Sequence, residues 1–82
     1  MPTFLDHHAM PELPGEMREA MAERIRSGQA DENGARAVNV YMADGEAYCL
    51  SDAPNAEAVL EAYAAAGIAI GRQDIVEVIP IA

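Results

Sequence analysis

The feature that most constrains the fold is a β-hairpin signature in the middle of the chain. Two runs with β-branched and aromatic residues, 37–42 and 46–50, flank the short turn Ala43-Asp44-Gly45. Asp-Gly between such runs is a strong signal for a tight turn that joins antiparallel strands. We therefore expect two adjacent antiparallel strands here, and the rest of the chain must be arranged around them.

A helical pattern lies on each side of the hairpin. Upstream, apolar residues recur at a spacing of four among charged ones, which predicts an amphipathic helix over residues 15–30. Gly34 follows it and is available as a left-handed cap. Downstream, Asn55 is suited to cap the start of a second helix, which we expect to end at Gly67.

The two ends of the chain are predicted to be strands, over residues 3–9 and 74–81. Pro80 places the last strand at an edge or a bulge, because proline cannot donate to the hydrogen-bond ladder. The predicted order is β-α-β-β-α-β, a single α+β domain over residues 1–82. This is the ferredoxin-like arrangement, in which a four-stranded antiparallel sheet carries both helices on one face.

The uncovered face of that sheet and the size of the chain both favour a homodimer. A domain of 82 residues buries only about 60 to 65% of the surface that its unfolded chain exposes. The composition is 51% hydrophobic but has no Trp and one Phe, so the core must consist mainly of small aliphatic side chains. We expect the open sheet face to pair with a second copy.

Charge and cysteine content exclude several classes of function. Fourteen acidic residues against five arginines and no lysine give a net charge of -9. This is the wrong sign for nucleic acid or an anionic membrane surface, so neither partner is expected. A single cysteine, Cys49, rules out an intramolecular disulfide, and no signal peptide or membrane span is recognisable. We expect an acidic, cytoplasmic protein.

Strand alternation predicts which side chains share the uncovered face. If Leu5 and the valines of the second and last strands meet the helices, several polar residues gather on the open face together. Those residues are Asp6, His8, Asn39, Tyr41 and Glu77. On the third strand, Cys49 is expected to point to the helices and to be an inert, buried thiol.

The chain start combines three kinds of metal ligand. His8 and Asp6 are two residues apart on one strand face, and Met10 follows just past the strand end. Imidazole and carboxylate suit nickel or zinc, and a thioether extends the range towards copper. His7 lies on the alternate face and joins this set only if the strand is bulged or already ending. We expect His8 to be the main ligand, with Asp6, His7 and Met10 as candidate partners.

Three other uses of these residues stay open. In an enzyme, Asp6 would orient His8 as a general base, with Tyr41 or Tyr48 as the acid. In a small-molecule-binding protein, Asn39, Tyr41 and Glu77 would line a pocket at the dimer interface. In a purely structural reading, His8 is a hydrogen-bonded interface residue. A non-catalytic role is favoured, since no nucleophile or phosphate-binding loop is marked.

Segments 1–8, 48–59 and 75–78 together resemble the small bacterial nickel-binding proteins of ferredoxin-like fold. The resemblance covers nearly the whole chain, and the middle segment, Tyr48 to Val59, is its most specific part. It implies a homodimer with facing sheets, and nickel bound by histidine-rich positions that include His8. Further histidines implied in the two helices are absent here, where the chain has Met21 or its neighbours and residues 63–65. Of the implied set, His8 remains, with Asp6 and the candidates His7 and Met10 beside it.

Overall fold

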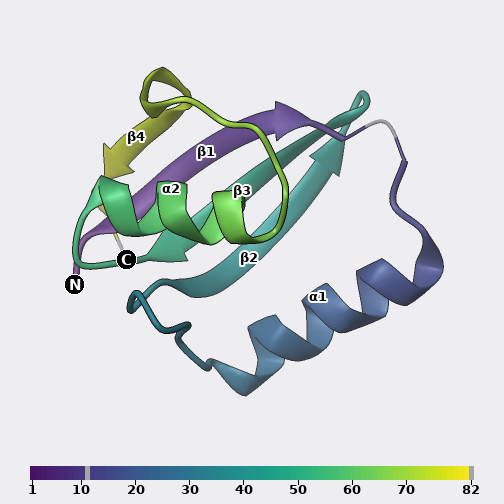
Figure 1. Cartoon of the computed structure of the whole chain (residues 1–82), viewed down its shortest axis with the longest axis horizontal. Coiled ribbons are helices and arrows are strands. Elements are labelled where there is room, and N and C mark those ends of the chain that lie inside the picture. Colours follow the sequence, from purple (N-terminus) through teal and green to yellow (C-terminus); the bar gives the residue numbers. More distant parts are fainter. Residues whose placement is uncertain (11, 82) are drawn as a thin grey trace.

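The computed structural model describes residues 1–10 and 12–81. Along the chain lie β1 (Thr3–Ala9), α1 (Gly15–Ser27), β2 (Arg36–Ala43), β3 (Glu46–Asp52), α2 (Ala56–Ala65), a short 3-10 helix η1 (Arg72–Asp74) and β4 (Ile75–Val78). The strands form one antiparallel sheet in the order β2-β3-β1-β4 (Figure 1). This element order and topology confirm the predicted ferredoxin-like fold.

Local chemistry explains the predicted hairpin. Asp44 and Gly45 have φ values of 51° and 77°, the two consecutive positive values that a type I′ turn requires. The turn sets the register of the hairpin, so that Tyr41 lies opposite Tyr48. Towards the other end of β2 the pairing shifts between Ala37 and Asn39, which marks a bulge.

The helix ends follow capping signals, and one of them differs from the prediction. The Asn55 side chain accepts a hydrogen bond of 2.9 Å from the Ala58 N–H at the start of α2. Helix α1 ends three residues earlier than predicted, because Gly28 rather than Gly34 takes the left-handed cap, with a φ of 66°. The Gly28 N–H donates to the Ile25 carbonyl at 3.2 Å. In the described part of the chain, neither helix has the length and apolarity to cross a membrane.

The two helices contribute very differently to the core. Helix α2 lies over the sheet (Figure 1), and its Ala58 and Val59 are buried in one cluster with Phe4 and Ile75. Helix α1 has no buried residue and lies alongside β2. The compact core is therefore under α2, and the space between α1 and the sheet is only partly filled.

The face predicted for β1 and β4 was wrong. Phe4, Asp6 and His8 are buried on the side covered by the helices, whereas Leu5 and His7 belong to the open face. Val76 pairs with Leu5 in register and is 54% exposed. The physical reason is size: burying the Phe4 ring removes more apolar surface from water than burying Leu5 does, and the strand alternation then carries Asp6 and His8 inward.

The faces predicted for the hairpin strands were correct. Cys49 is buried, with its side chain on the side of the helices, and it lies opposite Asp6 on β1. Asn39 and Tyr41 pair with Leu50 and Tyr48 on the open face. The hairpin residues and the β1 residues that were expected to share one face therefore lie on opposite faces of the sheet.

Candidate metal centre

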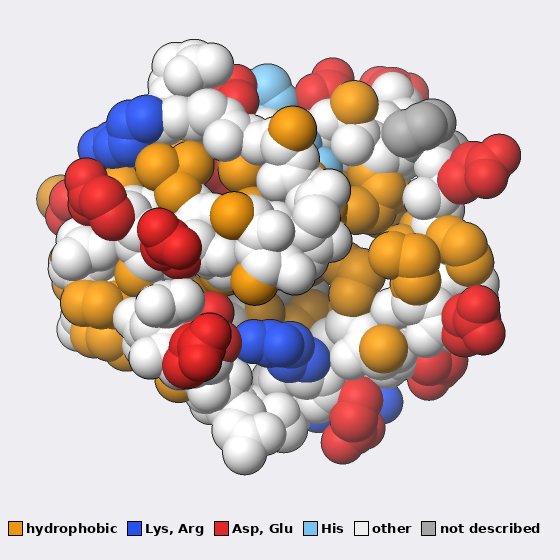
Figure 2. Space-filling view, in the orientation of Figure 1, with side chains coloured by type: hydrophobic (Ala, Val, Ile, Leu, Met, Phe, Trp, Pro, Cys, Tyr) orange, Lys and Arg blue, Asp and Glu red, His pale blue; other side chains and the backbone are white. Residues whose placement is uncertain are grey.

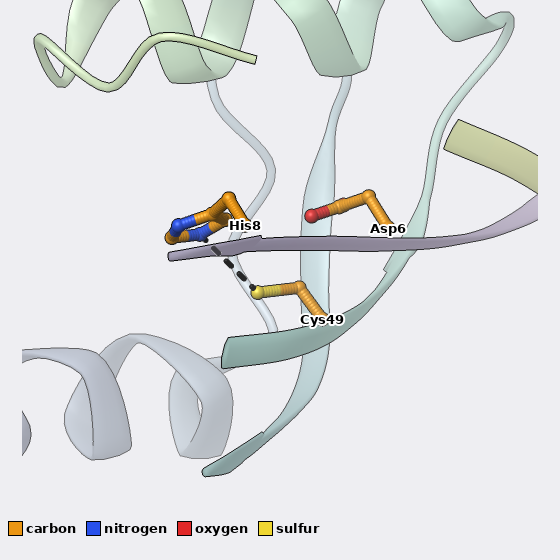
Figure 3. Close-up of side chains that lie close together, drawn as sticks. All are labelled: Asp6, His8 and Cys49. Carbon is orange, nitrogen blue, oxygen red and sulfur yellow. Dashed lines mark hydrogen bonds between the residues drawn. The ribbon is translucent and has the colours of Figure 1, made fainter. Parts of the chain in front are cut away.

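Three side chains of different chemistry meet under α2. Asp6 and His8 project from β1 and Cys49 from the neighbouring strand β3 (Figure 3). One oxygen, one nitrogen and one sulfur of this cluster all lie within 4.8 Å of one another. The antiparallel pairing of Asp6 with Cys49 brings the two strands' side chains together, and strand alternation places His8 beside them. The three residues are called the Asp6–His8–Cys49 cluster below.

Asp6 is the most unusual member of the cluster, because its carboxyl group is 1% exposed. Its Oδ1 accepts a hydrogen bond of 2.7 Å from the Tyr63 hydroxyl of α2. Its Oδ2 is buried without any hydrogen-bond partner among the described residues. Burial raises the pKa of Asp6 above its ordinary value, against the lowering effect of the Tyr63 hydrogen bond. A buried acceptor left unpaired is costly, so the position of this carboxyl group beside Cys49 and His8 calls for a functional explanation.

His8 is oriented as metal-binding histidines commonly are. Its Nδ1 lies 3.2 Å from the Ala9 carbonyl oxygen, which can only accept, so this contact places the proton on Nδ1. The Nε2 lone pair is then directed to the cluster, 4.0 Å from the Cys49 sulfur (Figure 3). The Tyr63 ring packs edge-on against the imidazole, with centroids 5.2 Å apart. Metal-binding histidines commonly donate their other ring N–H to a backbone carbonyl in this way, which fixes the tautomer and the orientation of the ring.

Cys49 is a buried thiol whose chemistry depends on its partners. Burial raises its pKa to about 11, and the Asp6 carboxylate adds to this effect. The free thiol is therefore protonated near neutral pH and is a weak nucleophile. Burial likewise raises the pKa of Tyr63, which remains a hydrogen-bond donor to Asp6. Binding a metal ion through Cys49 would require the loss of the thiol proton.

A cavity of about 560 Å³ adjoins the cluster, between α1, α2 and the sheet. His8 and Cys49 belong to its lining, together with the methionines Met10, Met17 and Met21. Figure 2 shows the hollow between the regions of α2 and α1, with hydrophobic side chains along its wall. The cluster is thus buried in protein on one side and adjoins an apolar hollow on the other.

The cluster fits a transition metal by donor chemistry and by spacing. A nitrogen, a carboxylate oxygen and a thiolate sulfur are all ligands of borderline divalent ions. Around a tetrahedral ion, with bonds of about 2.0 to 2.3 Å, nitrogen and sulfur ligands lie about 3.6 Å apart. The observed 4.0 Å between His8 Nε2 and Cys49 Sγ is only slightly longer. The unpaired Oδ2 of Asp6 gives the cluster a free acceptor for an ion.

The structure brings together only part of the predicted site. Asp6 and His8 are in the cluster, and Met10 lines the adjoining cavity. β1 pairs with β3 without a register shift through Ala9, so His7 stays on the open face. There its Nδ1 lies 3.0 Å from a Glu46 carboxylate oxygen, and its ring stacks on Tyr48.

The residues predicted to line a ligand pocket do not gather around His8. Asn39 and Tyr41 lie on the open face, where the Asn39 amide donates to the Tyr41 hydroxyl at 3.3 Å. Glu77 pairs with Phe4 near the other end of β1, at the sheet edge formed by β4, and is exposed. These three residues are therefore spread over both faces of the sheet.

Two members of the site were missed by sequence reasoning. Cys49 was assigned to the correct face, but it was interpreted as an inert buried thiol because no basic residue neighbours it in the sequence. Tyr63 was given no role in the site. A signal for Cys49 was available in the antiparallel pairing of the first and third strands, which places it beside Asp6. The Tyr63 contact spans 57 positions and has no local signature.

Comparison with known families identifies the family of the chain. The family model described as nickel responsive protein SCO4226-like matches residues 4–78, which cover the helices and strands except Thr3 at the start of β1 and include all three members of the cluster. Neither a curated protein nor a solved structure matches the chain. The chain, with its ferredoxin-like fold and buried Asp6–His8–Cys49 cluster, belongs to the SCO4226-like family of nickel-responsive proteins.

Proposed function

We propose that the protein binds a divalent transition metal, nickel first among them, through Asp6, His8 and Cys49, and that it acts as a binding protein rather than an enzyme. The observation that carries this proposal is the cluster itself: a carboxylate oxygen of Asp6 lies within 4.8 Å of a nitrogen of His8 and the sulfur of Cys49, and Asp6 Oδ2 is buried without a hydrogen-bond partner among the described residues. The family's description as nickel responsive supports the choice of ion.

Charge balance also supports a divalent ion at this buried position. One carboxylate from Asp6 and one thiolate from Cys49 cancel two positive charges, while His8 contributes a neutral nitrogen. A neutral assembly avoids most of the cost of burying an uncompensated charge. Tyr63 would hold the Asp6 carboxylate in position, and the Ala9 carbonyl would hold His8.

Met10 is the candidate for a further ligand. It lies two residues beyond His8 and lines the cavity next to the cluster. Its N–H donates to the Gly45 carbonyl at 2.8 Å, which anchors the backbone at this point. The bound ion would supply a Lewis-acidic centre next to the cavity, and these residues would bind and shield it.

Calorimetric titration with nickel near neutral pH tests the proposal. We expect His8→Gln to weaken nickel binding by about 10- to 100-fold or more, as loss of a ligand or its support does elsewhere. His7→Gln is the matched control, because the adjacent histidine lies on the opposite face and should leave affinity unchanged. Wild-type affinity no tighter than about millimolar, or equal losses in both variants, would refute the proposal.

The cavity supports a second candidate function, the binding of a small organic molecule. Its volume of about 560 Å³ falls in the ordinary range for ligand pockets, about 300 to 1,000 Å³. Ala62 of α2 lines it, whereas Ala64 on the same helix does not. Titration with an apolar fluorescent probe should therefore show weakened binding for Ala62→Phe and unchanged binding for Ala64→Phe. Equal binding in both variants would count against this function.

We further propose that the open face of the sheet forms a homodimer interface. Tyr41 and Val76 on this face are 52% and 54% exposed, and the stacked His7–Tyr48 pair lies beside them. Light scattering coupled to size-exclusion chromatography tests this. Val76→Glu should shift the protein to monomer, and Ala64→Glu on the exposed side of α2 should not. A monomeric wild type would refute the proposal.

A further inference from the structure

Three of the five methionines of the chain line one cavity. Met10 stands just past β1, on the same side of the strand path as His8 because it lies two positions further on. The other two, Met17 and Met21, lie one helical turn apart on α1 and therefore on the same helix face. The cavity thus receives thioethers from two separate elements.

The methionines of α1 do not serve as ordinary core residues. No residue of α1 is buried, and Met17 is 47% exposed. They border a hollow of about 560 Å³ whose lining also includes Cys49 and His8. A methionine that fills a core packs against neighbours on all sides, whereas these methionines line an open cavity that Cys49 and His8 also line.

Thiol, imidazole and thioether are together the ligand set that selects Cu(I). The charge of a monovalent ion is cancelled by the Cys49 thiolate alone, so the Asp6 carboxylate is not needed. A divalent ion, in contrast, needs both groups to reach neutrality. The two kinds of ion therefore depend on different parts of the same centre.

We propose that the cavity is a Cu(I) site, in which Cys49 and His8 bind the ion and the thioethers of Met17 and Met21 on α1 complete a four-coordinate shell. The inference rests on the proposed metal-binding function, since His8 and Cys49 are shared between the two ions. It goes beyond that function in naming a soft monovalent ion and in assigning a role to the exposed face of α1.

Competition with a chromophoric Cu(I) chelator under reducing, anaerobic conditions tests the proposal, with nickel calorimetry in parallel. The Met17→Leu/Met21→Leu double variant conserves side-chain volume and should fold normally, which circular dichroism checks. We expect it to weaken Cu(I) binding by at least about tenfold and to leave nickel affinity unchanged. Met42→Leu is the control, because Met42 lies on β2 outside the cavity lining.

Asp6→Asn provides the opposite arm of the test. It should weaken nickel binding without weakening Cu(I) binding, because the Asp6 carboxylate raises the pKa of the Cys49 thiol and its removal makes the thiolate easier to form. Wild-type Cu(I) affinity in the α1 double variant, or loss of Cu(I) binding in Asp6→Asn, would overturn the Cu(I) proposal. Methionine-dependent Cu(I) binding without nickel binding would instead refute the nickel proposal and support this one.

Discussion

Replacing Asp6 by Asn should make the metal-free protein more stable near neutral pH. Asp6 is 1% exposed, and one of its carboxyl oxygens has no hydrogen-bond partner within the part of the chain that the structure describes. Burial raises its pKa although the Tyr63 hydrogen bond opposes the shift, so its surroundings disfavour the charged form overall. Asn has nearly the same shape, keeps an oxygen that accepts from Tyr63, and carries no charge to desolvate.

The sign of the effect follows from linkage. A carboxyl group whose pKa is raised in the folded state favours folding most below its unfolded pKa of about 3.9. That contribution is lost as the pH rises through the folded pKa of Asp6. Above the folded pKa the wild type carries the penalty of a buried charge, and Asp6→Asn removes that charge. The expected gain is the difference between burying an unpaired charged group and an unpaired neutral one, about 1 to 3 kcal/mol.

Urea unfolding followed by far-UV circular dichroism, with a chelator present, measures this difference. The gain of about 1 to 3 kcal/mol expected near pH 7 should shrink as the pH falls through the raised folded pKa of Asp6, because the wild-type carboxyl group then becomes protonated. Glu61→Gln on α2 removes one exposed charge and controls for the net charge of -9. A variant less stable than the wild type near pH 7, or a gain that does not change with pH, would refute the reasoning.

Three further predictions use the same structure. The pKa of Cys49 is about 11, so metal binding near neutral pH must displace the thiol proton. Calorimetry should therefore show nickel affinity rising about tenfold for each pH unit up to that pKa, and Cys49→Ser should flatten this dependence of affinity on pH. Tyr63→Phe leaves both Asp6 oxygens unpaired and should lower unfolding free energy near pH 7 by about 1 to 3 kcal/mol in urea titrations. The Thr3 hydrogen bond lowers the pKa of Asp52. The stability that the Asp52 carboxylate contributes is therefore present above its unfolded pKa of about 3.9 and is lost as the pH falls through the folded value. In acid titrations followed by circular dichroism, Asp52→Asn should abolish that part of the acid destabilisation.

The element order was predictable because its signals are local. Asp44-Gly45 adopts the two positive φ values of a hairpin turn, and Asn55 caps α2 through a bond three residues away. Such contacts depend on a few neighbouring residues and leave a direct pattern in the sequence. The early end of α1 at Gly28 shows the limit of this approach, since two glycines were available and backbone geometry chose between them.

The candidate site was predictable only in part, because its composition depends on which face β1 turns inward. The alternation of side chains along β1 allows either of its two faces to be turned towards the helices. Burial of Phe4 favours one choice, and burial of Leu5 favours the other. The tertiary structure decides the phase by burying the larger ring under α2 and by supplying Tyr63 as a partner for Asp6. The same choice brings Cys49 to the cluster and leaves His7 outside it.

The sequence by itself therefore determined the fold and the presence of metal-ligand side chains near the chain start, since both follow from local residue types and spacing. Only the tertiary structure decided which of those side chains form a centre. Asp6, His8 and Cys49 come from two strands separated by about half the chain, and their meeting depends on strand register and on a helix contact from Tyr63. Register and packing are properties of the folded whole and have no counterpart in any single segment.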